Sequence, residues 1–348
     1  MLLLRVAVPL LLMLSAPIAI AQASGELIFP LGSTSFASSH ASTIVELNDG
    51  SLLSAWFGGS GEGHSDVVIW TSRLTANRWS TPVDLVREPR VPCWNPVLFH
   101  SRDGRLWLYY KFGPSPDTWA AARIYSLDEG LTWSAVEHLP AGILGPIRAK
   151  PLVLEDGTIV AGTSIEAYNS WAIWIERSTD NGKTWTKIGP ILPTRNPDAK
   201  EAPDTGRIRG LIQPSVVRLG KGHLRLYARS TQDIARICAA DSFDNGLTWT
   251  GAHPLDVPNP NSGIDAVALR DGRVVLIYNN STSERTPLNL AVSRDGEHFQ
   301  NFETLEAEPG EYSYPAIIQN ANGDLETTYT WNRRSIKYVH IPLQGVPK

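Results

Sequence analysis

An eight-residue motif that recurs along the chain limits the possible folds more than any other feature of the sequence. The motif reads SLDEGLTW at Ser126–Trp133, STDNGKTW at Ser178–Trp185 and SFDNGLTW at Ser242–Trp249. A shortened copy runs from Ser293 to Phe299, and a degenerate copy ends at Trp79. The closing aromatic residues lie 50 to 64 residues apart, a spacing that indicates a fold built from one repeated supersecondary unit.

Six hairpins alternate with these motifs. Each hairpin has an apolar strand, a turn that contains glycine, and a second apolar strand, and the turns end at Gly50, Gly104, Gly157, Gly222, Gly272 and Gly323. Most of these turns contain Asp-Gly or Asn-Gly, residues that tolerate the positive φ of a tight hairpin. Two hairpins in each repeat are typical of a four-stranded propeller blade. We therefore predict an all-β fold, a six-bladed β-propeller.

The motifs and the N-terminal segment each have an expected place in this ring. In each motif, the Asp can accept backbone N–H bonds and the Trp can fill the space between sheets, so we assign the motifs to fold stability. The sixth hairpin is followed by no copy of the motif. We expect residues 26–30 to supply the outer strand of that blade, because ring closure covers sheet edges that would otherwise stay open.

The first 23 residues are predicted to be a secretory signal peptide, since Arg5 precedes an apolar run and small residues follow it at 21–23. We therefore expect one propeller domain at residues 24–348, secreted or periplasmic, and no membrane contact after cleavage. A net charge of −4 with dispersed basic residues argues against nucleic acid as a partner. We expect a monomer in which Cys93 and Cys238 are buried free thiols.

Polar residues gather at one predicted face of the propeller. In each blade the innermost strand begins and the second strand ends at this face, so residues at those points converge on the central axis. The strand starts contribute His40, Asn95, Arg148, Gln213, Tyr312 and Tyr314, and the strand ends contribute Glu62, Asp66, Lys111, Glu166, Arg229, Arg285 and Arg333. Guanidinium groups bind carboxylates through two parallel hydrogen bonds. Several arginines around one axis therefore predict a pocket for a small acidic group.

The repeated motif, the six blades and this ring of residues resemble the sialidase superfamily over essentially the whole chain after residue 23. The segment around Arg229 resembles the one that carries the second arginine of the sialidase substrate triad, and Glu284-Arg285 resembles the third. The segment Glu311–Tyr314 resembles the one with the nucleophilic tyrosine. The resemblance implies that Arg229 and Arg285 bind a carboxylate and that Tyr312 attacks the anomeric carbon, where a neutral nucleophile avoids charge repulsion.

Three places depart from the superfamily pattern. His40 stands in place of the first arginine, Gln213 stands in place of the glutamate that activates the tyrosine, and Glu62 and Asp66 share the loop of the acid. We expect Glu62, with Asp66 in reserve, to protonate the leaving oxygen. His40 could bind the carboxylate when protonated or act as a base when neutral. The remaining substrate-binding residues are expected to be Arg148 as the third cation, Gln213, Asn95 and Tyr314.

These roles predict hydrolysis of a terminal acidic sugar, sialic acid or a relative, from a glycan that carries a carboxylate. Two alternatives stay open. One is a lyase or glycosidase that acts at a uronic acid, in which His40 or Tyr312 removes the C5 proton. The other is a sugar-binding propeller without turnover. No cofactor is expected, because the sequence has neither metal-ligand spacing nor a phosphate-binding glycine loop.

Overall fold

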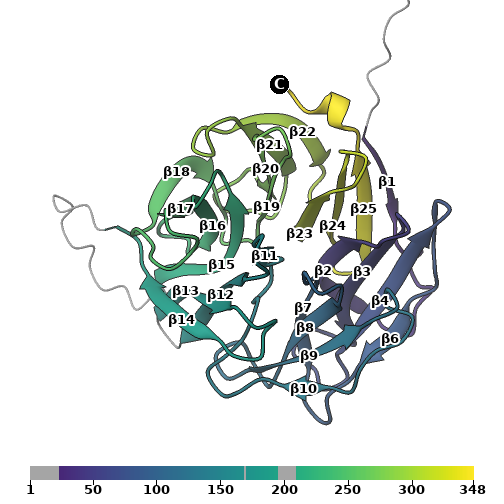
Figure 1. Cartoon of the computed structure of the whole chain (residues 1–348). Helices are drawn as coiled ribbons and strands as arrows, with labels where there is room; N and C mark the ends of the chain where they lie inside the picture. The colour runs from purple at the N-terminus through teal and green to yellow at the C-terminus, as the bar shows by residue number, and fades with distance from the viewer. Residues whose placement is uncertain (1–22, 168–169, 195–208) are drawn as a thin grey trace, which may run out of the picture.

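The computed structural model describes residues 23–167, 170–194 and 209–348 (Figure 1). Of the expected signal peptide, only Ala23 belongs to these ranges. The described chain consists of strands β1 to β25 and a short 3-10 helix, η1, at Leu343–Gly345. Within these ranges, no helix combines the length and apolar character needed to cross a bilayer.

Six antiparallel units surround a common axis, and the first strand of each lies nearest to it (Figure 1). The first unit contains β2 (Ser38–Glu46), β3 (Leu52–Gly59), β4 (Val68–Thr75), β5 (Arg78–Trp79) and β6 (Val83–Val86). The second contains β7 (Cys93–His100), β8 (Leu106–Phe112), β9 (Ala120–Ser126) and β10 (Glu137–His138). The third contains β11 (Leu152–Val153), β12 (Ile159–Ala167), β13 (Ser170–Ser178) and β14 (Thr186–Ile191).

The other three units complete the ring. The fourth contains β15 (Arg209–Arg218), β16 (Leu224–Ser230), β17 (Arg236–Ser242) and β18 (His253–Pro258). The fifth contains β19 (Asp265–Ala268), β20 (Val274–Asn279), β21 (Leu288–Ser293) and β22 (Gln300–Glu306). The sixth contains β23 (Tyr312–Gln319), β24 (Leu325–Trp331), β25 (Ser335–Ile341) and, from the other end of the chain, β1 (Ser24–Leu27).

The predicted six-bladed propeller is confirmed, with one irregularity in its hydrogen bonding. The third and fourth units are joined into one sheet, because the start of β13 pairs in parallel with the start of β15. The predicted closing strand also forms, but at Ser24–Leu27 rather than at 26–30. It ends before Pro30, which has no N–H to donate and whose carbonyl instead accepts a turn bond from the amide of Ser33 (3.1 Å).

The repeated motif forms the same compact hairpin in each intact copy. The Asp128 carboxylate accepts hydrogen bonds from the Thr132 amide (2.8 Å) and hydroxyl (2.6 Å) and from the Ser126 hydroxyl (2.7 Å). The hydrogen bonds from Thr132, followed by the one from Ser126, lower the pKa of Asp128 to about 2. Asp180 and Asp244 accept the same set of bonds, which supports the assignment of the motifs to fold stability.

We expect the substitution Ser178→Ala to destabilise the fold by about 1–3 kcal/mol, the usual cost of leaving a buried donor unsatisfied. The buried Ser178 hydroxyl accepts the Gly182 amide and donates to Asp180, both at 2.8 Å. Urea unfolding at neutral pH would measure the loss. The exposed neighbour Thr179 provides the control, since Thr179→Ala should change the free energy of unfolding little. Equal stability of the two variants would contradict this account of the motif.

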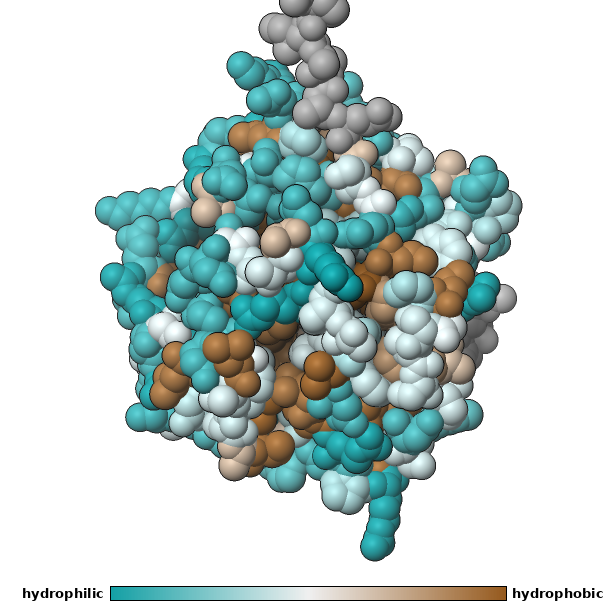
Figure 2. Space-filling view, turned by 90° about the vertical axis from the view of Figure 1, so that its right-hand side faces the viewer, coloured by the Kyte–Doolittle hydropathy of each residue, from teal (hydrophilic) through white to brown (hydrophobic). Residues whose placement is uncertain are grey.

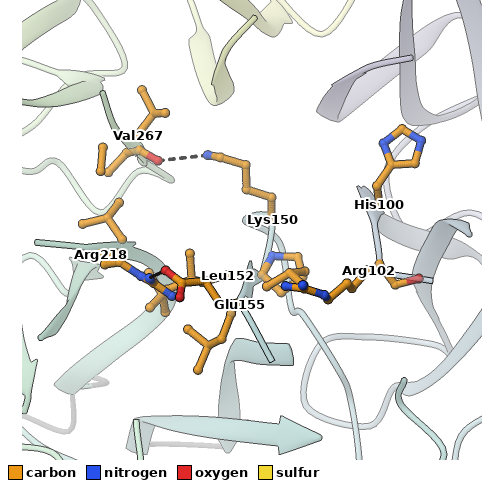
Figure 3. Close-up of a pocket in the computed structure, with 15 residues that line it drawn as sticks. His100, Arg102, Lys150, Leu152, Glu155, Arg218 and Val267 are labelled. Carbon is orange, nitrogen blue, oxygen red and sulfur yellow. Dashed lines mark hydrogen bonds and ion pairs between the residues drawn. The ribbon is translucent and has the colours of Figure 1, made fainter. Parts of the chain in front are cut away.

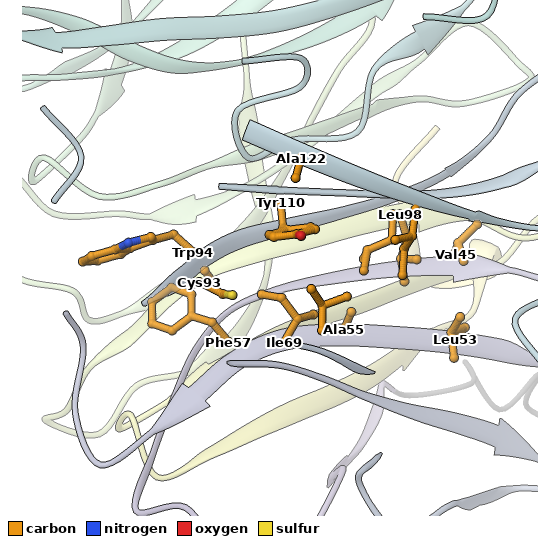
Figure 4. Packing of buried hydrophobic residues seen from close by; sticks show 14 of the residues in the cluster. Val45, Leu53, Ala55, Phe57, Ile69, Cys93, Trp94, Leu98, Tyr110 and Ala122 are labelled. Carbon is orange, nitrogen blue, oxygen red and sulfur yellow. The ribbon is translucent and has the colours of Figure 1, made fainter. Parts of the chain in front are cut away.

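Apolar side chains fill the space between neighbouring units. Between the first two units, the cluster includes Val45, Ala55, Ile69, Leu98 and Tyr110 (Figure 4). On the side of the molecule shown in Figure 2, the hydrophobic residues that reach the surface form small groups between polar ones. The core is therefore distributed between the units around the ring.

Both cysteines are free and buried, as predicted. Cys93 lies in the cluster between the first two units, and Cys238 lies in the cluster between the third and fourth. Burial raises the pKa of each thiol to about 12. Since the thiolate is the reactive form, both residues serve as apolar packing groups at neutral pH.

Candidate functional site

Four of the six inner strands carry the same irregularity close to their first residues. Their pairing register shifts in β2, β7, β15 and β23. Within each shifted segment one residue adopts a positive φ: Ala41 (56°), Asn95 (35°), Gln213 (54°) and Tyr314 (51°). Non-glycine residues adopt this conformation at a cost, and bulges of this kind re-aim side chains next to active sites.

The hydroxyl of Tyr314 is the meeting point of two of these strands. It accepts hydrogen bonds from Nη1 of Arg229 (2.7 Å) and from Nε2 of Gln213 (3.3 Å). Arg229 is held in turn by Asn261, whose Oδ1 lies 2.7 Å from its Nε, and by Oε1 of Gln213 at 3.2 Å. Two donors directed at one phenolic oxygen stabilise negative charge that develops on it.

The ring of Tyr314 lies among cations. The Cζ atoms of Arg148, Arg229 and Arg285 lie 5.3, 5.7 and 5.7 Å from the ring centroid. The imidazole of His40 lies on the same ring, with centroids 4.2 Å apart. Tyr314, which we predicted only as a substrate-binding residue, is therefore the tyrosine at the centre of the predicted arginine cluster.

The structure places Tyr312 outside this cluster, contrary to the position that we expected for the nucleophile. Its side chain is 3% exposed and packs in a hydrophobic cluster with Ile277, Leu288 and Tyr329. A regular strand would place residues 312 and 314 on one face. The bulge between Ser313 and Ala316 breaks that alternation and turns the two tyrosines to different surroundings.

Arg148 is committed to the fold rather than to a ligand, which corrects its predicted role as third cation. The residue is 3% exposed, and its guanidinium donates to the backbone carbonyls of Ile264 (2.7 Å) and Pro315. These bonds join the third, fifth and sixth units near the axis. The buried Lys111 acts in a similar way, because its Nζ donates to the Pro146 carbonyl, and burial lowers its pKa to about 7.

Arg333, at the end of the second strand of the sixth unit, stands where a third cation was expected. Its Nε donates to both oxygens of Glu311 at 2.9 Å, and Nη1 of Arg285 donates to the same carboxylate at 2.7 Å. Arg333 is also ion-paired with Glu62. Arg229 thus lies at the end of the second strand of the fourth unit, and Arg285 and Arg333 lie in the connections after the second strands of the fifth and sixth units.

His40 is fully buried, and its surroundings exclude one of its two predicted roles. Burial first, then the charges of Arg333, Arg285, Arg148 and Arg229, lower its pKa well below the ordinary value. The imidazole is therefore neutral at physiological pH and does not bind a carboxylate as a cation. Its Nδ1 lies 2.9 Å from the Thr330 hydroxyl, and its buried Nε2 has no hydrogen-bond partner among the described residues.

The first three units supply carboxylates at the corresponding points of the ring. Glu62 follows β3, Asp117 follows β8, and Glu166 lies near the end of β12. Burial raises the pKa of Glu166 to about 7; the charge of Arg229 opposes the rise, and those of Asp117 and Glu62 add to it. The ring is thus divided into a carboxylate half (Glu62, Asp117, Glu166) and an arginine half (Arg229, Arg285, Arg333).

Asp66 is unsuited to its predicted reserve role as proton donor. Its carboxylate accepts hydrogen bonds from the amide and the hydroxyl of Ser60, both at 2.9 Å, and so closes the loop after β3. Burial acts to raise its pKa, but these hydrogen bonds outweigh that effect and lower the pKa below the ordinary value. Asp66 is therefore ionised at neutral pH.

Several predicted residues meet as expected, and others were missed. Gln213, Arg229, Arg285, His40 and Tyr314 form one connected group, while Asn95 lies at the bulge of β7. Sequence reasoning did not assign roles to Arg333, Glu166 and Asp117. All three lie at or after the end of the second strand of a unit, and this position could have indicated a role in the site. The pattern is visible only when the same position is compared in all six units. The described residues contain no group of three or more His, Cys, Asp or Glu arranged to hold a metal ion.

A pocket of about 570 Å³ lies at the opposite ends of the inner strands (Figure 3). Its charged groups are largely paired already: Arg218 with Glu155 at 2.9 Å, and Lys150 with Asp265 and the Ala266 carbonyl, both at 2.9 Å. The four residues with positive φ, the carboxylate half and the arginine half lie at the other end of these strands. We therefore place the candidate site at the end that carries Tyr314.

Comparison with solved structures agrees with the propeller architecture. The NanB sialidase of Streptococcus pneumoniae superposes with a TM-score of 0.74 at 16% identity, over 92% of this chain and 71% of that chain. A protein of unknown function from Dyadobacter fermentans gives 0.75 at 15% identity, over 91% and 97% of the two chains. An α-L-arabinanase of Penicillium chrysogenum gives 0.69 at 15%, over 94% and 100%. At these identities the likeness concerns the fold.

Comparison at the level of sequence identifies one relative over a short segment and one family over most of the chain. A sialidase of Clostridium perfringens is 34% identical over 94 residues, which is 22% of this chain and 24% of that protein. The match therefore spans about a quarter of the relative's length. The family of BNR repeat-like domains matches residues 50–327, most of the described ring. The chain belongs to this family of BNR repeat-like domains and has the fold of the sialidase superfamily.

Proposed function

We propose that the chain is a glycoside hydrolase of the sialidase type that removes a terminal acidic sugar, sialic acid or a relative, from glycans. One observation carries the proposal: the Tyr314 hydroxyl accepts bonds from Arg229 and Gln213 while its ring lies beside Arg285. A phenolic oxygen held among guanidinium groups suits a reaction in which positive charge develops on an anomeric carbon that bears a carboxylate.

The arginine half would bind the substrate carboxylate. Arg229, Arg285 and Arg333 each have a fixed position, because Asn261 holds the first and Glu311 holds the other two. Preorganised donors need no rearrangement during the reaction. The Tyr314 oxygen would then attack the anomeric carbon or stabilise the charge on it.

Gln213 cannot take a proton from Tyr314, so the hydrolase would not use the base found in the superfamily pattern. The amide instead donates a hydrogen bond to the tyrosine oxygen at 3.3 Å. The neutral imidazole of His40 contacts the same ring and is a second polar group near Tyr314. It could accept the proton that Tyr314 loses.

Elimination at a uronic acid is the second candidate function, because the neutral His40 has a ring nitrogen, Nε2, without a partner among the described residues. A neutral, buried imidazole among arginines could remove the C5 proton while the arginines neutralise the adjacent carboxylate. The electron pair of the C5–H bond would form a C4–C5 double bond, the bond between C4 and the leaving oxygen would break, and that oxygen would take up the proton held by His40. This reaction adds no water to the product.

One assay separates these functions. The protein would be incubated in ¹⁸O-labelled water with oligosaccharides capped by sialic acid or by uronic acid, and the products read by mass and ultraviolet absorbance. Free sialic acid that contains ¹⁸O supports the hydrolase. A new ultraviolet absorbance without ¹⁸O supports the lyase. Binding without any product would contradict both and support a sugar-binding propeller.

A further inference from the structure

The carboxylate half of the ring contains one acid that differs from the others. Glu166 makes no hydrogen bond or ion pair with any described residue, and its Oε1 is buried without a partner. Glu62 is paired with Arg333, Asp66 with Ser60, and Asp117 accepts a bond from Ser115. Glu166 is therefore the acid whose proton and lone pairs are free for a ligand.

The strand pairing places Glu166 next to the arginine half. Glu166 pairs with Trp171 across β12 and β13, and the Cζ atom of Arg229 lies 5.8 Å from the Trp171 ring. Trp171 is thus the cross-strand neighbour of Glu166 and a contact of Arg229, and the charge of Arg229 acts on the Glu166 carboxyl group. A sugar whose carboxylate binds Arg229 would therefore lie close to Glu166.

The charges around Glu166 suit a residue that carries a proton near neutral pH. Asp117 and Glu62, from the connections after β8 and β3, oppose its ionisation, whereas Arg229 on β16 favours it. Burial adds the largest contribution, and together they raise the pKa to about 7. An acid catalyst is most effective when its pKa lies close to the working pH.

We propose that Glu166 is the catalytic acid that protonates the leaving oxygen of the glycoside, an inference that rests on the proposed hydrolase function. In this step the O–H bond of Glu166 breaks and its proton joins the glycosidic oxygen. The bond between that oxygen and the anomeric carbon breaks, and its electron pair stays on the oxygen. Water then bonds to the anomeric carbon, and the proton that this water loses returns to the Glu166 carboxylate, which restores the acid.

The test compares two substrates that carry the same acidic sugar. One is a natural oligosaccharide, whose alcohol leaving group needs protonation, and the other is a 4-nitrophenyl glycoside, whose phenolate leaves without it. For Glu166→Gln we expect kcat/KM to fall about 10²–10⁴-fold on the oligosaccharide, the usual contribution of a general acid, and less than tenfold on the aryl glycoside. Glu155→Gln, at an exposed carboxylate, should change neither rate.

The pH profile provides a second readout. The active form has Glu166 protonated, so the wild-type rate on the oligosaccharide should fall as pH rises through about 7. This limb should be absent in Glu166→Gln. An infrared titration that compares the wild type with Glu166→Gln would detect the carboxyl group independently of turnover, and the absence of a group titrating near pH 7 would overturn the proposal.

The outcomes separate this inference from the proposed function. Turnover of either substrate by the wild type tests the hydrolase function alone. Given turnover, an equal loss on both substrates in Glu166→Gln would show a structural role for Glu166 and overturn its assignment as the acid. A substrate-dependent loss in Glu62→Gln, with none in Glu166→Gln, would assign the proton donor to Glu62 instead. A wild type without turnover would contradict both proposals.

Discussion

Replacement of Tyr314 by Phe should lower kcat by about 10²–10³-fold, which is the usual loss when one preorganised polar group is removed from a developing charge. The substitution keeps the ring that lies on His40 and removes only the oxygen that accepts bonds from Arg229 and Gln213. Steady-state kinetics on the substrate identified by the product assay would measure the loss. Calorimetry with the free sugar acid would show whether binding persists.

Tyr312→Phe is the matched control, because it removes the same hydroxyl two residues away. Tyr312 packs among apolar side chains, so its variant should keep kcat within about threefold of the wild type. The reverse pattern, a large loss at Tyr312 and none at Tyr314, would contradict the assignment that follows from the bulge in β23. Retained affinity in Tyr314→Phe, in a protein without turnover, would support a lectin.

Replacement of Arg148 by Met should destabilise the protein by about 3 kcal/mol or more. Hydrogen bonds to a charged group contribute roughly 1.5–3 kcal/mol each, and this guanidinium makes two, to the buried carbonyls of Ile264 and Pro315. Both carbonyls lose their charged donor in the variant. Urea unfolding monitored by tryptophan fluorescence would measure the change.

The exposed Arg102 offers the comparison for this substitution. Arg102→Met changes the same chemical groups at a surface position, so the free energy of unfolding should stay within about 0.5 kcal/mol of the wild type. If Arg148→Met is as stable as Arg102→Met but binds the sugar acid more weakly, Arg148 would be a substrate ligand after all. That result would restore the role expected from the sequence.

The propeller itself could be predicted because its signals are local. In the repeated motif, Ser126, Asp128 and Thr132 bond to one another within a few residues, so a short stretch of sequence contains all the groups that form the hairpin. The glycine turns and the period of the motifs set the number of units. Even the closing strand followed from the need to cover an open edge, although its bounds depended on pairing with β25.

The sequence predicted most of the residues that gather at the candidate site, but it did not predict how they are arranged. The rule that second strands end at one face correctly gathered Arg229, Arg285 and Arg333, because a regular repeat brings equivalent positions to equivalent places. The sequence could not show that three consecutive units supply acids and the next three supply arginines. That division depends on which side chain each unit supplies after its second strand, and the repeated pattern does not fix the residue type there.

Three features were decided by the tertiary structure alone. The choice between Tyr312 and Tyr314 depended on a bulge that local alternation does not encode. The partners of Arg148 lie 116 and 167 residues away in the chain, so no short segment reveals them. The pKa of Glu166 is set by burial and by charges from other units. Local hydrogen bonds and turns thus determined the blades, whereas long-range contacts determined which polar groups were left for chemistry.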